Sequence, residues 1–262
     1  AAPPRIEQGL AEAVSSAASE GRALRRRRVC VEPVAGAFDA LRILAAQPAH
    51  ETIFYMERPD AGEVICHGQR LGLGSPRRSR AAGIAMVHQH FTLVPSISVA
   101  ENLALGEGGR GLLWVDRRAA ETRAAELAAE LGFKLDPRAR LATLSVGDQQ
   151  RAEILKALAP PGVRCLVLDE PTATLTPREA EELFAVVRRL RAAGRAVIFV
   201  SHKLREVLSL TDRVVVLRRG RVVAERDTRE TGAGELARLM VGESLARAAT
   251  ASAAVGAEAT QP

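Results

Sequence analysis

The sequence predicts an α/β protein from about residue 61 onward. Short apolar runs alternate there with longer amphipathic runs, as strands and helices do when they follow one another along a chain. Residues 164–169 and 196–201 are apolar almost throughout, which is typical of central strands in a parallel sheet with both faces covered. Residues 214–217 and 221–224 flank an Arg-Arg-Gly turn and predict a hairpin.

The helices are predicted from the residues that begin and end them. Two starts have the spacing of a capping box, in which a hydroxyl and a carboxylate satisfy free backbone amides. A third start has an aspartate cap, and glycines mark the ends. The predicted signals are Ser98 with Glu101, Thr176 with Glu179 and Gly194, Asp116 with Gly132, and a final helix 235–241 closed by Gly242.

Composition narrows the class of protein. The chain has 262 residues, 47% of them apolar, so it can bury a core and form one or two domains. No apolar run approaches the roughly 18 residues that span a bilayer, and three scattered cysteines suit neither a disulfide framework nor a metal cluster. We therefore expect a soluble, intracellular protein without disulfides.

The net charge of +6 raises the question of nucleic-acid binding. Almost all the cations are arginine, and the one dense run, 25–28, has no aromatic residues interleaved to stack on bases. A solvated arginine surface is the better interpretation. The termini are less informative: we expect a helix near 6–24, a strand at 29–34, and a disordered tail or linker from about 246 to 262.

The strongest chemical signal is an apolar run, 165–168, that ends in Asp169 and Glu170. Such a strand end faces the ligand crevice of an α/β sheet. One carboxylate can hold Mg²⁺ while the next polarises an attacking water, as phosphoryl transfer requires. Alone, the pattern is equally consistent with a strand that meets an ordinary loop.

Three weaker signals accompany this pair. Residues 144–151, Leu-Ser-Val-Gly-Asp-Gln-Gln-Arg, precede an apolar helix and predict an anion site at its first turn, although Ser145 could be an ordinary N-cap. His202 ends the strand 196–201 and could contact a phosphate or a water, although a lone histidine there is more often structural. Gln89 follows another apolar run and could ligate Mg²⁺.

Taken in order, these four segments resemble the Q-loop, signature, Walker B pair and switch histidine of the ABC ATPase family. The resemblance covers about residues 58–243 and is closest to importer subunits for nucleosides and simple sugars, in the first of two tandem ATPase halves. It implies a P-loop NTPase-like α/β core with a helical subdomain at about 92–160. Residues 1–57 would be an atypical segment, with the N-terminal β-subdomain degenerate or disordered, and residues 244–262 a tail.

The resemblance also implies roles for individual residues. Asp169 and Gln89 would serve Mg²⁺, with Gln89 also sensing the membrane partner; Glu170 would be the general base, and His202 would position the γ-phosphate of ATP. The signature residues Ser145, Val146, Gly147, Asp148 and Gln149 would bind ATP held by the opposite ATPase copy. Val146 and Asp148 depart from the consensus Gly and the commoner Glu.

The same resemblance implies partners and a location. The chain would pair with a second ATPase half or copy on two transmembrane permease subunits, at the cytoplasmic face of the cell membrane. An extracytoplasmic substrate-binding protein would act indirectly, and no nucleic acid is expected. The spacing of roughly fifty residues between Gln89 and Leu144 suits a compact helical subdomain, with no coiled-coil insertion of the DNA-repair type.

One element that the family needs is absent from the sequence. No G-x-x-x-x-G-K-[ST] motif occurs, and the first lysine is Lys134. Family spacing puts the phosphate-loop lysine near Ala46, where residues 45–49 contain no glycine and include Pro48. The adenine-stacking aromatic residue also has no match, because Phe38 lies too near the expected loop. We therefore doubt that the chain binds ATP in its own site and expect it to be inactive when isolated.

Two explanations remain open. The chain is a natural degenerate subunit, nonhydrolytic and regulatory or structural, or its start is a misread or frameshifted copy of an ordinary ATP hydrolase. The abrupt onset of resemblance near Arg58, after an Arg-rich and Ala-rich start without pattern, favours the second.

Overall fold

The computed structural model describes residues 76–106, 116–218 and 221–241, together with the backbone of four short strands before them. Those strands are β1 (Val29–Val31), β2 (Leu41–Ala45), β3 (Val64–Cys66) and β4 (Gln69–Leu71). The helix expected near 6–24, the tail 246–262 and Gly242 lie outside the described residues.

A six-stranded sheet carries the described fold, in the order β5-β6-β7-β2-β8-β9. Its further strands are β5 (Ile84–Val87), β6 (Cys165–Asp169), β7 (Ala196–Val200), β8 (Arg213–Arg218) and β9 (Arg221–Asp227). β5, β6, β7, β2 and β8 are parallel, and β9 pairs antiparallel with β8. The predicted central strands and the predicted hairpin are confirmed.

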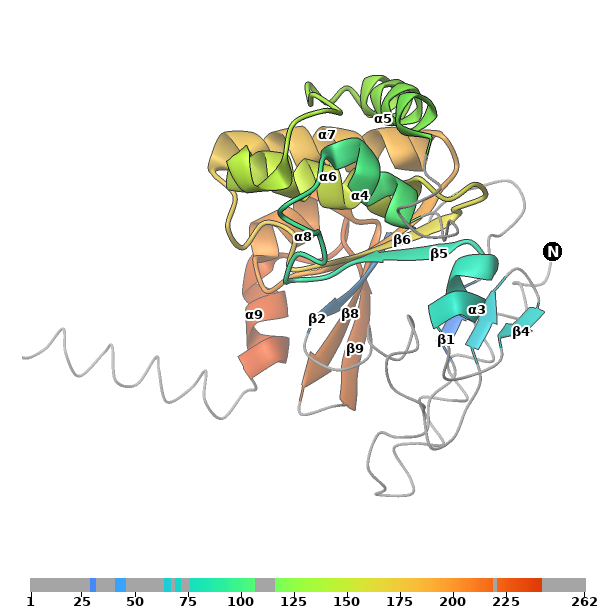
Figure 1. Cartoon of the computed structure of the whole chain (residues 1–262). Coiled ribbons are helices and arrows are strands. Elements are labelled where there is room, and N and C mark those ends of the chain that lie inside the picture. Colours follow the sequence, from blue (N-terminus) through green and yellow to red (C-terminus); the bar gives the residue numbers. More distant parts are fainter. Residues whose placement is uncertain are drawn as a thin grey trace, which may run out of the picture.

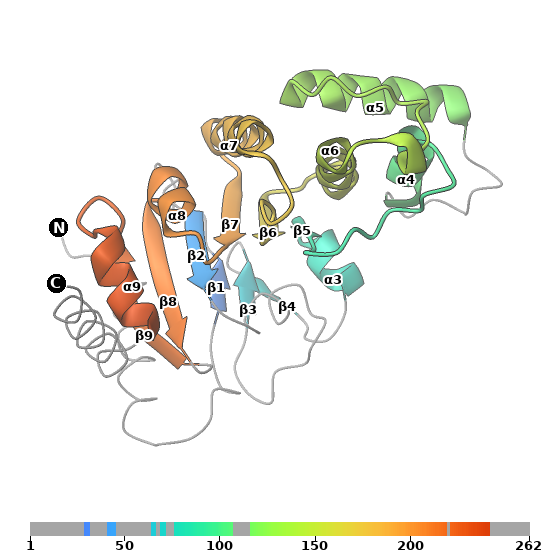
Figure 2. The same ribbon diagram turned by 90° about the vertical axis from the view of Figure 1, so that its left-hand side faces the viewer.

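Helices join these strands and cover the sheet (Figures 1 and 2). They are α3 (Pro76–Ala81), α4 (Val99–Gly106), α5 (Arg117–Leu131), α6 (Val146–Leu158), α7 (Pro177–Ala192), α8 (Leu204–Leu210) and α9 (Ala233–Val241), with a short 3₁₀ turn at Leu141–Thr143. In both views α6 and α7 lie over β5–β7, and α5 lies farther from the sheet. The core between these layers includes Phe199, fully buried, whose ring meets Phe184 of α7 edge to face at 6.4 Å.

The predicted helix boundaries that fall on described residues are confirmed, except for the start of the last helix. The Ser98–Glu101 and Thr176–Glu179 capping boxes both form, with reciprocal hydrogen bonds between side chain and backbone. Asp116 accepts from two amides at the start of α5, and Gly132 ends that helix in the left-handed conformation, with φ of 71°. The last helix, α9, begins two residues earlier than predicted, at Ala233.

The N-terminal strands only partly match the prediction. β1 falls within the strand expected at 29–34 and pairs with β3, which pairs in turn with β4 to form a separate small sheet. β2 was not predicted, and it lies between β7 and β8 in the main sheet. The strand thus extends the main sheet into a segment where the sequence showed no pattern.

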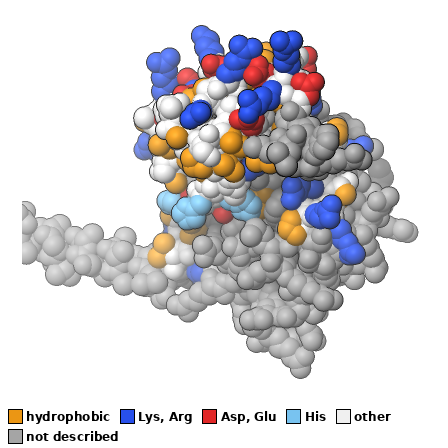
Figure 3. Space-filling view, in the orientation of Figure 1, with side chains coloured by type: hydrophobic (Ala, Val, Ile, Leu, Met, Phe, Trp, Pro, Cys, Tyr) orange, Lys and Arg blue, Asp and Glu red, His pale blue; other side chains and the backbone are white. Residues whose placement is uncertain are grey.

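The surface, the helices and the positions of acidic, cysteine and histidine side chains bear on three predictions about the class of protein. Figure 3 shows Lys and Arg side chains interspersed with Asp and Glu over the helical end of the molecule, which suits a solvated surface. Within the described part of the chain, no helix is long and apolar enough to cross a membrane. Nor does that part hold a group of three or more His, Cys, Asp or Glu side chains arranged for a metal ion.

Candidate functional site

The carboxyl ends of three adjacent parallel strands form the centre of the candidate site. Val87, the last residue of β5, pairs with Leu168 of β6, and Asp169 at the end of β6 pairs with Val200 of β7. Because parallel strands in register end at one edge of a sheet, the residues that follow them lie along that same edge. Asp169, Glu170 and His202 therefore come from neighbouring strand ends, and Gln89 follows the third, exposed in a bend.

Glu170 and His202 are in direct contact. The imidazole Nδ1 of His202 lies 2.8 Å from Oε1 of Glu170, and the histidine side chain is 70% exposed while the glutamate is 18% exposed. The second carboxylate oxygen of Glu170, Oε2, is buried and has no hydrogen-bond partner among the described residues. Buried polar atoms normally have a hydrogen-bond partner, so this oxygen would take one from an ordered water or from a ligand at the site.

The backbone of Glu170 is strained. Its φ is +44°, the sole positive value of a non-glycine residue among those described, and its amide donates to the carbonyl of Val200 at 2.9 Å. Such a conformation costs of order 1–3 kcal/mol and persists where surrounding contacts impose it, often at functional sites. The strain turns the chain sharply after β6 and leaves the Glu170 side chain next to the end of β7.

A polar cluster fixes the two loops on which these residues lie. Lys203 donates through Nζ to the carbonyl of Thr172 at 2.8 Å and pairs with Glu206 at 3.4 Å. The Thr172 hydroxyl donates to Glu206 at 2.7 Å, and the Lys203 amide donates to the Ser201 hydroxyl at 3.1 Å. Thr172 and Ser201 are buried, so these bonds hold the segment after Glu170 against the segment around His202.

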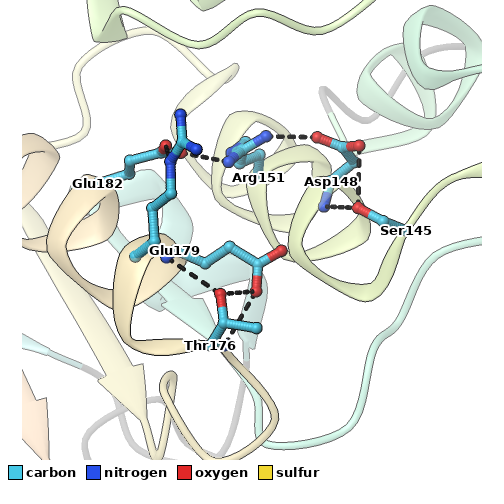
Figure 4. A network of polar contacts seen from close by, with 7 residues as sticks. Ser145, Asp148, Arg151, Thr176, Glu179 and Glu182 are labelled. Carbon is cyan, nitrogen blue, oxygen red and sulfur yellow. Dashed lines mark hydrogen bonds and ion pairs between the residues drawn. The ribbon is translucent and has the colours of Figure 1, made fainter.

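The signature residues form a second group at the first turn of α6 (Figure 4). Ser145 is the N-cap: its hydroxyl accepts from the Asp148 amide at 3.1 Å and donates to the Asp148 carboxylate at 2.9 Å. Gln149 donates to the carbonyl of Leu144 at 3.1 Å, and Val146 is 46% exposed. The ordinary N-cap interpretation of Ser145 is thus confirmed.

Contacts from this turn run to α7. Arg151 binds Asp148 at 2.5 Å and also binds Glu182 of α7. Gly147 packs against Glu179, and a Cβ on this glycine would lie 2.0 Å from the Glu179 carboxylate. The first turns of α6 and α7 therefore lie together (Figure 4).

Residues of these clusters were missed by the sequence prediction. Lys203 adjoins His202 in sequence, so it carried a signal. Nothing in the sequence pointed to Glu179 as a neighbour of Gly147.

The donor set suits Mg²⁺ and a nucleotide only in part. Carboxylate and amide oxygens such as those of Asp169 and Gln89 are the ligands that Mg²⁺ uses beside water and phosphate. The segment that should bind the phosphates does not match the family pattern. With a lysine near Ala46, a G-x-x-x-x-G-K loop would occupy about residues 40–46, and strand β2, Leu41–Ala45, takes up those positions. The β2 strand ends at the same edge as β7, with which it is parallel.

Comparisons with known proteins identify the family to which the chain belongs. Residues 50–173 match the family model described as ABC transporter. A crystal structure of a nucleotide-free ATP-binding cassette from an ABC transporter superposes with a TM-score of 0.66 at 21% identity, covering 79% of this chain and 86% of that chain. The chain belongs to the ABC transporter family and has the fold of its ATP-binding cassettes.

Within this family the chain is similar to sugar and nucleoside import proteins. It is 47% identical over 191 residues to the ribose import ATP-binding protein RbsA 3 of Rubrobacter xylanophilus, covering 72% of this chain and 38% of that protein. It is 40% identical over 193 residues to the guanosine import ATP-binding protein NupO of Bacillus subtilis, covering 74% and 38%. The chain thus spans less than half the length of these relatives.

Proposed function

We propose that this chain is an ATPase subunit of an importer for nucleosides or simple sugars, and that ATP hydrolysis at a cassette dimer interface drives the transport. The names of the relatives support the substrate class. The observation that carries the proposal is the Glu170–His202 contact at the edge where β6 and β7 end. A base next to an imidazole at that edge is what hydrolysis of a bound nucleotide requires.

Each site residue has a part in this proposal. Glu170 accepts a proton from the attacking water through its unpartnered Oε2, while His202 holds Oε1 in place and contacts the γ-phosphate. Asp169 and Gln89 would hold Mg²⁺, which neutralises charge on the phosphates when it is bound. The first turn of α6, from Ser145 to Gln149, would bind the ATP held by an opposite cassette.

A second candidate function follows from β2. If strand β2 replaces the phosphate loop, this chain cannot hold ATP itself but can still offer its signature turn to an intact partner. It would then be a nonhydrolytic subunit of an asymmetric pair. A misread start of an ordinary ATPase gene would yield the same sequence, and the experiment below separates these alternatives.

The remaining parts of the proposal concern organisation. Residues 58–243 would form most of the cassette, with a helical subdomain at about 92–160 that contains α4, α5 and α6. The partners would be two permease subunits and a second cassette, at the cytoplasmic face of the membrane. Residues 244–262 would lie outside the cassette, whereas strand β2, Leu41–Ala45, belongs to its main sheet.

The test restores the phosphate loop. Residues 1–57 are replaced by the corresponding segment of the Rubrobacter xylanophilus relative, and Mg-ATP binding and hydrolysis are measured beside the unaltered chain. We expect the unaltered chain to bind no Mg-ATP by calorimetry and the chimera to bind and hydrolyse it. Glu170→Gln in the chimera should abolish turnover and spare binding, because only the base is altered. Glu121→Gln, at an exposed ion pair with Arg138, is the matched control.

The outcomes separate the alternatives. Tight Mg-ATP binding by the unaltered chain would overturn the reading of residues 40–46. Hydrolysis by the Glu170→Gln chimera at the parent rate would show that Glu170 is not the base. A chimera that binds ATP but never hydrolyses it, alone or beside an intact cassette, would favour the nonhydrolytic subunit. Resequencing the start of the gene tests the misread start directly.

A further inference from the structure

Glu153 is a buried carboxylate that the proposed chemistry does not use. It lies in the middle of α6, is 3% exposed, and is surrounded in sequence by the core residues Ala152 and Ile154. Both of its oxygens are taken by Thr92: the Thr92 amide donates to Oε2 at 3.2 Å, and the Thr92 hydroxyl donates to Oε1. Burying a carboxylate destabilises the fold unless the carboxylate is hydrogen-bonded. The two bonds from Thr92 therefore offset the cost of burying Glu153.

Lys156 also hydrogen-bonds to Thr92. It follows Glu153 by three positions, on the same side of α6. Its Nζ donates to the carbonyl oxygen of Thr92 at 2.7 Å and to the hydroxyl at 3.0 Å. Every polar atom of Thr92 therefore contacts α6, although Thr92 lies in a segment without regular structure and is itself exposed.

The chain remains anchored beyond Thr92. The Val94 amide donates to Oδ1 of Asn102 at 2.8 Å, and Nδ2 of Asn102 donates back to the Val94 carbonyl at 3.1 Å. Asn102 is fully buried in α4. On the other side, β5 is anchored to β6 as far as the pair Val87–Leu168. The residues between the two anchored points are 88–91, which include Gln89.

From this geometry we infer that Glu153 and Lys156 are positioning residues, which fix the loop carrying Gln89 relative to the first turn of α6. Residues 88–91 reach at most about 14 Å when extended, so a displacement of Gln89 is transmitted through Thr92 to α6. The α6 helix begins with the signature turn at Ser145. The inference rests on the proposed function only in naming Gln89 and that turn as parts of one site.

The test measures this placement without nucleotide or partner. Spin labels are introduced at His90 and Val146, both exposed, through a keto-bearing noncanonical amino acid, so that the native cysteines stay. We expect one narrow distance distribution in the parent chain. Glu153→Ala should broaden it or add a second population, because Thr92 then loses both acceptors on α6. Hydrogen exchange of the Thr92 amide should rise by roughly tenfold or more, as expected when a bond to a charged acceptor is removed.

Two further variants keep the test decisive if Glu153→Ala does not fold. Thr92→Val, at an exposed position, removes the hydroxyl that bonds to both α6 side chains and should broaden the distribution. Thr92→Ser keeps every donor and acceptor and should restore the narrow one. A Glu121→Ala control should change nothing, because that carboxylate pairs with the exposed Arg138 and not with Thr92.

The result that would overturn the inference is a narrow, unshifted distribution in both Glu153→Ala and Thr92→Val, with unchanged exchange at Thr92. Broadening accompanied by a general loss of helical signal in every variant except the control would also count against it, since that would indicate a merely structural role. Neither outcome depends on ATP hydrolysis. A failure of the proposed function would leave the distance measurement intact.

Discussion

Replacing Gly147 with alanine tests the packing of the signature turn against α7. The new Cβ would lie 2.0 Å from Oε1 of Glu179, which is too close, so the carboxylate must move. That carboxylate accepts from the Thr176 amide at 2.9 Å and from the Thr176 hydroxyl at 2.7 Å, which is one half of the capping box of α7. The substitution in α6 should therefore damage the start of a different helix.

Two opposing contributions set the expected change in the free energy of unfolding. Loss of the reciprocal capping bonds costs about 1–2 kcal/mol, towards the lower end on an exposed surface. Alanine in place of glycine in a helix gains about 0.5–1 kcal/mol. Gly147→Ala should therefore change the free energy of unfolding by between about zero and 1.5 kcal/mol, in the destabilising direction.

Gly234 provides a matched control. It is the second residue of α9, as Gly147 is of α6, and nothing lies within 4 Å of a Cβ built there. Gly234→Ala should stabilise the protein by about 0.5–1 kcal/mol, through the helix term alone. Urea unfolding followed by circular dichroism should thus separate the two variants by about 1–2 kcal/mol.

A double-mutant cycle isolates the cause. In a Glu179→Ala background the obstructing carboxylate is gone, so Gly147→Ala should become as stabilising as Gly234→Ala. If Gly147→Ala already stabilises the parent as much as Gly234→Ala does, the contact with Glu179 imposes nothing, and the reasoning is refuted. Additive effects in the cycle would lead to the same conclusion.

The remaining predictions concern the core, the acid range and the site. Phe199→Ala should cost about 3–5 kcal/mol in urea unfolding, because the ring is fully buried; a cost under about 1 kcal/mol would contradict its packing on Phe184. Hydrogen bonds from the Thr176 amide and then its hydroxyl lower the pKa of Glu179 below its ordinary 4.5. The stability that Glu179 adds over Glu179→Gln should therefore be full near neutral pH and disappear as the pH falls through that lowered pKa; a pH-independent difference would contradict it. Thr172→Val in the restored chimera should lower kcat with little change in KM, because it loosens the loop after Glu170; a change in KM alone would argue against this role.

The sequence predicted the elements whose signals are local. A cap is set by residues within one turn, so Ser98 with Glu101 and Asp116 with Gly132 could be recognised without knowledge of the fold. β6 and β7 were recognisable because a strand buried on both faces must be apolar along its whole length. β2 gave no such signal: its residues, Leu-Arg-Ile-Leu-Ala, have no clear period, and their strand conformation depends on the neighbours β7 and β8.

The candidate site was harder to predict because its contacts join distant residues. Glu170 and His202 are separated by 32 positions, and only the pairing of β6 with β7 brings them together. The resemblance to a known family named both residues, but it could not show which oxygen stays unpartnered. Buried polar residues such as Glu153 were overlooked since a charge inside a helix is usually solvent-facing. Its partner, Thr92, is 61 residues away.

The loops that carry Glu170 and His202 contrast with residues 40–46, where the phosphate loop would lie. This contrast bears on how the chain arose. A subunit that had lost ATP hydrolysis long ago would have no need to keep a strained Glu170, its imidazole contact, or the buried cluster that holds both loops. All of these are intact, whereas residues 40–46 depart from the phosphate loop completely. Damage confined to one contiguous segment is what a shifted reading frame produces, while gradual loss would spread over the whole site. If Glu170 and His202 have the roles proposed above, we expect a misread start and not a degenerate subunit, and resequencing that segment decides between them.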